Sequence, residues 1–166
     1  MALTKLGPND ANTVGDLPAI GSSAVDFTLT ATNMKDVGFK DFAGKNVVLN
    51  IFPSIDTDVC ATSVRKFNVQ AAALKNTQVI CLSADLPFAH KRFCGAEGIK
   101  NLITASLFRD QNFATDYGVL IKDGPLAGLT ARAVIVVDEK GRILYSQLVD
   151  DITHEPDYEA ALAALA

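Results

Sequence analysis

The chain has 166 residues, of which 49% are hydrophobic and 20% charged, with a formal net charge of −4 at pH 7. This length suits one domain spanning residues 1–166, and a net negative charge favours neither nucleic acid nor anionic lipid as a partner. No apolar run approaches the ~18 residues of a membrane span, and residues 1–8 lack a signal-peptide pattern. We therefore expect a cytoplasmic globular protein.

The chain contains three cysteines, Cys60, Cys81 and Cys94, and two histidines, His90 and His154. An odd number of cysteines is unlike the disulfide framework of a secreted domain. The separations between these five residues match no compact zinc pattern, so we expect neither a metal nor another cofactor. In a reducing compartment, such cysteines are either quiet core residues or reactive thiols.

Turn-forming residues divide the first twenty positions. Gly-Pro-Asn-Asp at 7–10 and Gly15 predict a short β-hairpin within residues 1–20. The apolar run at 47–52 then predicts a strand covered on both faces, which Pro53 ends. After it the hydrophobic period becomes helical, with one face formed by Cys60, Val64, Phe67, Ala71 and Leu74.

A second apolar strand is predicted at 79–82. It is followed by a predicted helix that begins at Pro87 and continues to about Cys94, where Gly95 stops it. Strand, helix and strand in this order form a crossover unit, and a crossover joins two parallel strands.

The second half of the chain predicts a short helix, a hairpin and a closing helix. These elements cover 112–117, ended by Gly118, then 133–137 and 143–148 around a turn, and finally 156–166. A βαβ unit followed by ββα is the order of the thioredoxin-like fold. The sequence therefore predicts an α/β protein with a central mixed sheet flanked by helices, and an N-terminal hairpin as an extension.

Cys60 lies just after the end of a predicted strand, in the first turn of a predicted helix with Asp56 or Thr57 as N-cap. Unpaired N–H groups and the positive end of the helix dipole favour a thiolate there. Cys60 also shares an apolar stripe with Val64 and Phe67, and free cysteine is among the most buried residue types. From spacing alone, a reactive and a structural Cys60 are equally good interpretations.

The residues around Cys60 read P-x-x-x-T-x-x-C, with Pro53 and Thr57 at the fixed positions. This motif resembles the active-site signature of the peroxiredoxin superfamily, which that family also carries between a strand and a helix. The chain is similar in particular to its thiol peroxidase branch, the atypical two-cysteine peroxiredoxins. The similarity extends from the hairpin to the last helix and is clearest at 50–57, 59–60, 63–68, 83–89, 92–95, 131–133 and 146–150.

The resemblance implies a role for each matched residue. Cys60 would attack a hydroperoxide as thiolate and become sulfenic acid, and Thr57 would order thiolate and peroxide for this attack. The guanidinium of Arg132 would reach back to Cys60 and stabilise negative charge there. Pro53 would shield the sulfur from water. Without the resemblance, Arg132 is a surface cation in an ion pair and Pro53 is only the end of a strand.

Cys94 corresponds to the resolving cysteine of this branch. The resemblance implies an intrachain Cys60–Cys94 disulfide that thioredoxin reduces, and a homodimer. Cys81, in mid-strand, is interpreted as a core residue. Asp58 departs from the family pattern, where a small or apolar residue is more common, and we expect its carboxylate to point to solvent.

A competing hypothesis is a non-enzymatic redox sensor or binding module of the thioredoxin-like fold, in which Cys60 only reports oxidation. Thr57 and Arg132 favour turnover, because a passive sensor has less use for them. A thioredoxin-type disulfide reductase is excluded, since the residue three positions after Cys60 is Ser63 and no C-x-x-C pair exists.

Overall fold

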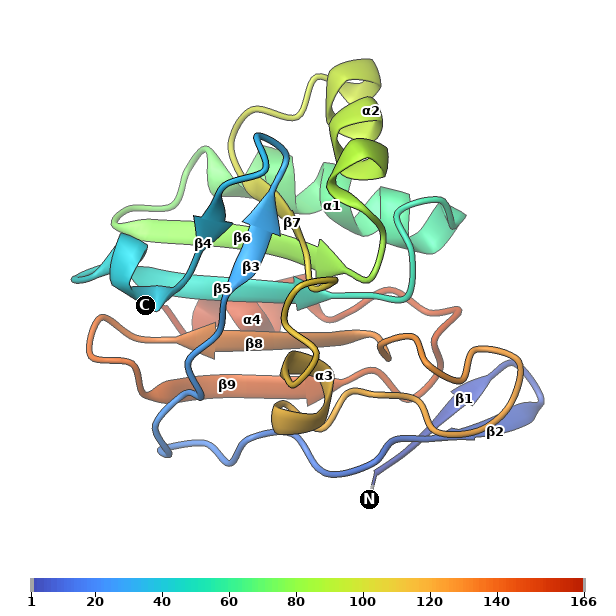
Figure 1. Cartoon of the computed structure of the whole chain (residues 1–166). Helices are drawn as coiled ribbons and strands as arrows, with labels where there is room; N and C mark the ends of the chain where they lie inside the picture. Colours follow the sequence, from blue (N-terminus) through green and yellow to red (C-terminus); the bar gives the residue numbers. More distant parts are fainter. Residues whose placement is uncertain (1, 166) are drawn as a thin grey trace.

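The computed structural model describes residues 2–165. In chain order its elements are β1 (Leu3–Leu6), β2 (Asn9–Asn12), β3 (Leu29–Ala31), β4 (Asp36–Val37), the 3₁₀ helix η1 (Phe39–Phe42), β5 (Asn46–Ile51), α1 (Asp58–Ala71), β6 (Thr77–Ser83), α2 (Pro87–Glu97), β7 (Ile103–Ser106), α3 (Phe113–Asp116), β8 (Ala133–Val137), β9 (Ile143–Leu148) and α4 (Tyr158–Ala163). Over this range β1 and β2 form the expected hairpin, and the other strands form one sheet in the order β4-β3-β7-β6-β5-β8-β9 (Figure 1).

The centre of the sheet is the predicted crossover unit. Strands β5 and β6 are parallel, with Val48 opposite Val79, and α1 connects them. On the other side of β5, strand β8 runs antiparallel and pairs in turn with β9. The mixed sheet of the thioredoxin-like fold is thereby confirmed. Strands β3, β4 and β7 were not predicted, because two to four residues are too few to show a clear period.

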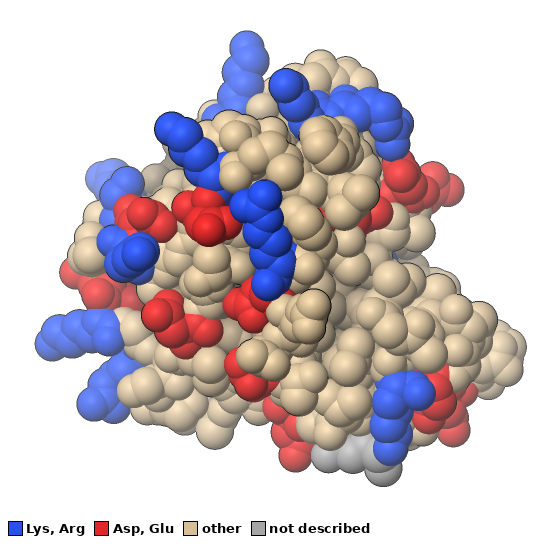
Figure 2. Space-filling model, viewed as in Figure 1, with Lys and Arg blue, Asp and Glu red and all other residues tan. Residues whose placement is uncertain are grey.

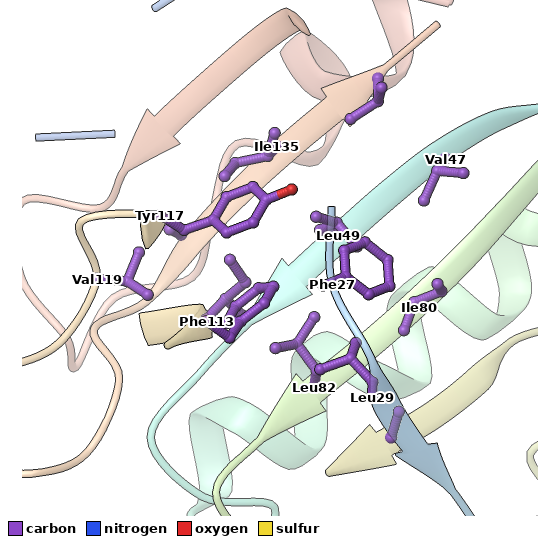
Figure 3. Close-up of a cluster of buried hydrophobic side chains, with 14 of the residues drawn as sticks. Phe27, Leu29, Val47, Leu49, Ile80, Leu82, Phe113, Tyr117, Val119 and Ile135 are labelled. Atoms are coloured by element: carbon purple, nitrogen blue, oxygen red, sulfur yellow. The ribbon is translucent and has the colours of Figure 1, made fainter. Parts of the chain in front are cut away.

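Each face of the sheet has its own apolar core. Helices α1, α2 and α4 cover one face, where Cys60, Phe67 and Cys81 are buried together. On the opposite face, Phe113 and Tyr117 from around α3 pack with Phe27 against strand residues of β5, β6 and β8 (Figure 3). The continuous apolar runs in the sequence follow from this burial on both faces.

Helix α2 ends later in the chain than the sequence predicted. The helix does not stop at Gly95; it continues to Glu97 and ends at Gly98, which is left-handed with φ of 65°. The N–H of Gly98 donates to the carbonyl of Cys94, a common way to close a helix end. Cys94 therefore lies inside the helix rather than at its end. The closing helix α4 is also shorter than the predicted 156–166.

The N-terminal hairpin lies beyond the carboxyl end of β9, where Lys5 forms a bridge with Asp151 (Figure 1). The hydroxyl of Thr4 donates to the carbonyl of Val149 (2.7 Å), and the N–H of Ile152 donates to the carbonyl of Lys5 (2.7 Å). Strand β2 contacts the loop before β8, where the N–H of Lys122 donates to the carbonyl of Asn12. These contacts hold the hairpin against the end of the sheet at which Cys60 lies.

Acidic and basic side chains are interspersed over the face shown in Figure 2. Across residues 2–165 no helix combines the length and the apolar character needed to span a membrane.

Gly118, just after α3, lies at a close approach between the loop that leads to β8 and the backbone of Asp16. Its φ is +68°, and a Cβ atom there would lie 2.0 Å from the carbonyl oxygen of Asp16. Gly44 also has a positive φ, +79°, but no atom within 4 Å of its Cβ position. We expect Gly118→Ala to lower the free energy of unfolding by about 3 kcal/mol or more, and Gly44→Ala by about 1 kcal/mol. Urea unfolding followed by circular dichroism measures both; equal losses would contradict this packing.

Candidate active site

Cys60 is the third residue of α1, and its side chain is fully buried at the amino end of the helix. Thr57 is the N-cap residue, with extended backbone. The first intrahelical bond runs from the N–H of Ala61 to the carbonyl of Thr57, so the N–H of Cys60 is among the amides without an intrahelical partner. The sulfur therefore lies where a helix terminus favours negative charge.

The guanidinium of Arg132 lies against this sulfur. Its Nη2 is 3.2 Å from Cys60 Sγ, and its Nε donates to the carbonyl of Ile152 at 2.9 Å. Arg132 is only 1% exposed. Its Nη1 is buried with no hydrogen-bond partner in residues 2–165. A buried cation beside a buried thiol, with one donor unused, is a site able to bind an anionic or electron-rich oxygen next to the sulfur.

Arg132 precedes β8, and the pairing of β8 with β5 brings it to the start of α1. The neighbouring Thr130 secures the same junction, because its hydroxyl donates to the carbonyl of Phe52 at 2.7 Å. Residues 72 positions apart in the chain thus meet at one end of the sheet.

An apolar cavity of about 280 Å³ is lined by Arg132, the residue that contacts the Cys60 sulfur. Arg132, Thr57 and Pro53 line it together with Ser54, Asp58 and Thr153. Its remaining walls are apolar and come from the hairpin, the first turn of α1, the loop before β8 and the segment after β9, in the side chains Leu6, Val59, Leu126, Leu129 and Ile152. Sequence reasoning missed these leucines, and their spacing around 126–129 gives no period that could have marked them.

Thr57 and Pro53 both line this cavity. The Thr57 hydroxyl donates to the carbonyl of Ser54 at 3.0 Å, so it has a backbone partner within the turn. Pro53 is buried at the end of β5. Asp58 is exposed, as expected, and this lets its carboxylate remain hydrated beside the thiol.

The turn between β5 and α1 is held from outside by Asp85, a residue to which the sequence assigned no role. Its carboxylate accepts from the Ser54 hydroxyl at 2.8 Å and from the N–H of Ile55 at 2.7 Å. Asp85 follows β6, whose carboxyl end lies beside that of the parallel β5. The position just after a parallel strand could have marked it.

Cys94 does not contact Cys60. It lies in α2, half-buried, with its sulfur 3.1 Å from the hydroxyl of Thr104 on β7. Burial raises the pKa of the Cys94 thiol, and the Thr104 contact opposes this shift. A second cavity, bounded by the β3–β4 turn and β7, reaches Cys94 from the side.

Cys81 is fully buried in β6, and the Asn50 amide donates to its sulfur at 3.5 Å. Burial raises its pKa to about 12, so the Cys81 thiol stays protonated at neutral pH. All three cysteines are free thiols in this structure. Among residues 2–165 no group of three or more His, Cys, Asp or Glu side chains is arranged to hold a metal ion.

Comparisons with known proteins agree with this geometry. The Redoxin family model matches residues 19–162. The thiol peroxidases of Corynebacterium glutamicum and Mycobacterium bovis are 56% and 58% identical over 165 residues, covering 99% of this chain and 99% of each relative. The crystal structure of a peroxiredoxin-like protein from Aquifex aeolicus has a TM-score of 0.91 at 35% identity and covers 99% of this chain and 96% of its own. The chain belongs to the Redoxin family, in the thiol peroxidase branch of the peroxiredoxins.

Proposed function

We propose that this chain is a thiol-dependent peroxidase that reduces hydroperoxides through Cys60. The observation that carries the proposal is the 3.2 Å contact between Cys60 Sγ and the buried guanidinium of Arg132. A fixed cation at this distance stabilises the thiolate, which is the nucleophilic form of cysteine. The curated thiol peroxidases that match over the whole chain support the same activity.

In the first step the Cys60 thiolate attacks one oxygen of the peroxide. A sulfur–oxygen bond forms, the oxygen–oxygen bond breaks, and the second oxygen leaves as alkoxide or hydroxide, which takes a proton from solvent. Cys60 becomes sulfenic acid and is oxidised by two electrons. We propose that the buried Nη1 donor of Arg132 stabilises charge on the peroxide oxygens. We also propose that Thr57 and Pro53, which line the cavity, confine the substrate there.

The cavity walls favour an organic substrate. Leu6, Leu126 and Leu129 present apolar surface next to Arg132, where the alkyl group of a hydroperoxide would be removed from water. We infer that alkyl hydroperoxides bind with their alkyl chains along these walls. Hydrogen peroxide has no alkyl chain and therefore gains no binding free energy from them. The product is an alcohol in the first case and water in the second.

In the second step Cys94 resolves the sulfenic acid. Its thiolate attacks the Cys60 sulfur, the sulfur–oxygen bond breaks, and the oxygen leaves as hydroxide, which takes a proton from solvent to become water. The product is an intrachain disulfide. The dithiol of thioredoxin then reduces this disulfide by thiol exchange. Cys94 lies over β7 and Cys60 follows β5, so β6 separates them. Two strand spacings are roughly 9–10 Å, whereas bridged cysteines need Cα atoms within about 7 Å. Disulfide formation therefore requires α1 or α2 to open locally.

The non-enzymatic sensor is the less favoured hypothesis, because a passive thiol needs no buried cation and no substrate cavity.

We propose that residues 1–166 form one domain, because the hairpin supplies Leu6 to the cavity. The proposal places this domain in the cytoplasm. It also includes a homodimer. Leu86 and Phe88, at the start of α2, are 51% and 66% exposed, and exposed apolar side chains of this size are typical of interfaces.

Single cysteine-to-serine changes assign the three thiols. Cys60→Ser should abolish peroxide consumption in an assay with thioredoxin, thioredoxin reductase and a nicotinamide electron source. Cys94→Ser should consume about one equivalent of peroxide and then stall, because the sulfenic acid has no resolving partner. Cys81→Ser should keep most of its turnover and serves as the matched control. Normal turnover by Cys94→Ser would refute the assignment, and one stoichiometric oxidation by the wild type without recycling would favour the sensor.

Changing Arg132 to Lys keeps a positive charge but removes the planar head that contacts Cys60 through Nη2 and the Ile152 carbonyl through Nε. We expect the second-order rate with peroxide to fall by roughly 10²-fold, as for the loss of one preorganised donor. Alkylation of Cys60 near neutral pH should also slow. Arg109→Lys, at an exposed ion pair with Asp36, is the control. Unchanged rates in Arg132→Lys would remove this residue from the site.

Leu126→Asn tests the apolar wall. We expect its rate with cumene hydroperoxide to fall roughly tenfold relative to its rate with hydrogen peroxide, because part of the alkyl contact is lost. Val69→Asn introduces the same side chain at a position on α1 that is 73% exposed and is not among the residues lining the cavity. An equal effect of Leu126→Asn on both substrates would show that the wall does not bind the alkyl group.

A further inference from the structure

The turn that carries Thr57 and the helix that carries Cys94 are joined by a chain of hydrogen bonds through the end of β6. At the turn, the carboxylate of Asp85 accepts hydrogen bonds from the Ser54 hydroxyl and from the N–H of Ile55. The same carboxylate also accepts from the hydroxyl of Ser83, the last residue of β6. Ser83 in turn contacts Nε2 of His90, in the first half of α2, at 3.1 Å.

The proton positions in this chain follow from the donors available. The single hydroxyl proton of Ser83 is donated to Asp85, so Ser83 Oγ can only accept from His90. His90 must therefore carry its proton on Nε2, and Nδ1 is the acceptor. Nδ1 is buried without a hydrogen-bond partner in the described chain, and His90 is fully buried. A neutral histidine is thus held in α2 by one polar contact, that with Ser83.

We infer that Asp85, Ser83 and His90 are positioning residues that lock the Cys60 turn and the Cys94 helix in the closed, peroxide-reactive arrangement. The inference rests on the proposed function, because it names what must be released before the Cys60–Cys94 disulfide forms. Opening α2 withdraws His90 from Ser83. The hydroxyl of Ser83 then loses its hydrogen bond with His90, while Asp85 still holds the turn that precedes Cys60.

The buried histidine also links opening to acidity. Burial lowers the pKa of His90 to about 4, although the carboxylates of Asp85 and Asp56 oppose this shift. In the open state His90 is hydrated, with a pKa near the ordinary ~6.5. Because the pKa of His90 is lower in the closed state than in the open state, neutral His90 stabilises the closed state fully above pH ~6.5. This stabilisation is lost as the pH falls from ~6.5 toward 4. Acid should therefore favour opening of α2.

The first experiment is amide hydrogen exchange, read by mass spectrometry, on the reduced full-length protein. Ser83→Ala removes the link between Asp85 and His90. We expect exchange in 87–97 to be about three- to tenfold faster, the effect of losing a buried hydrogen bond. Ser106→Ala is the matched control, because Ser106 is equally buried and pairs with Ser83 in the adjacent strand. Equal exchange in the two variants would overturn the inference.

The second experiment compares pH 7 with pH 5, each exchange rate being corrected for its intrinsic chemical rate. Opening of α2 in the wild type should increase roughly twentyfold at pH 5, from the two pKa values above. His90→Gln keeps an N–H donor for Ser83 but does not titrate, so its acid-side increase should disappear. A purely structural role of His90 would slow or speed exchange equally at both pH values and would contradict the inference.

Rapid-quench mass spectrometry connects the lock to turnover. After peroxide addition, the sulfenic acid of Ser83→Ala should convert to disulfide faster than that of Ser106→Ala, again by about three- to tenfold. Unchanged conversion would overturn the link to resolution. The exchange measurements use no peroxide. A wild type that consumes no peroxide would therefore refute the proposed function, whereas unaltered exchange in Ser83→Ala would refute the lock alone.

Discussion

The buried contact between Arg132 and Cys60 is the interaction on which the rest of the site depends. A guanidinium that is 1% exposed is costly unless an anion or strong acceptors surround it. Arg132 Nε donates a hydrogen bond to the Ile152 carbonyl, and Arg132 Nη2 donates to the Cys60 sulfur. The sheet supplies the geometry, because β8 delivers the arginine and β5 delivers the helix start to the same end. In the proposed function this cation stabilises the negative charge that develops at the site when Cys60 reacts with peroxide.

The two cysteines to which the proposal gives roles have opposite surroundings, and this difference orders the proposed steps. Cys60 is fully buried beside a cation, and that cation lines the apolar cavity. Cys94 is half-buried beside a neutral hydroxyl, with its pKa raised by burial. Under the proposed mechanism, these surroundings favour oxidation at Cys60 before Cys94 reacts. Resolution needs the closed structure to yield, so a lock through Asp85, Ser83 and His90 would set the balance between the two steps.

The sequence alone was informative where local patterns decide the structure. The apolar runs at 47–52 and 79–82 predicted the parallel pair, and the change of period at Cys60 predicted a helix that begins beside it. The approach of Arg132 came from family resemblance, since no local pattern can bring together residues 72 positions apart. Gly95 was mistaken for a helix end because two glycines lie close together and only backbone conformation distinguishes Gly98. The cavity leucines come from the hairpin and from the loop before β8, two segments that meet only in the folded chain, and no periodicity encodes this meeting.

The central claim is that oxygen transfer occurs first at the thiol held by Arg132. Reduced protein mixed with one equivalent of an alkyl hydroperoxide, quenched at successive times and digested, reports this directly by mass spectrometry. The account predicts that one oxygen atom appears first on the peptide containing Cys60. That species should then be replaced by a disulfide joining the Cys60 and Cys94 peptides. Oxygen appearing first on Cys94 or Cys81, or a disulfide that excludes Cys60, would contradict it.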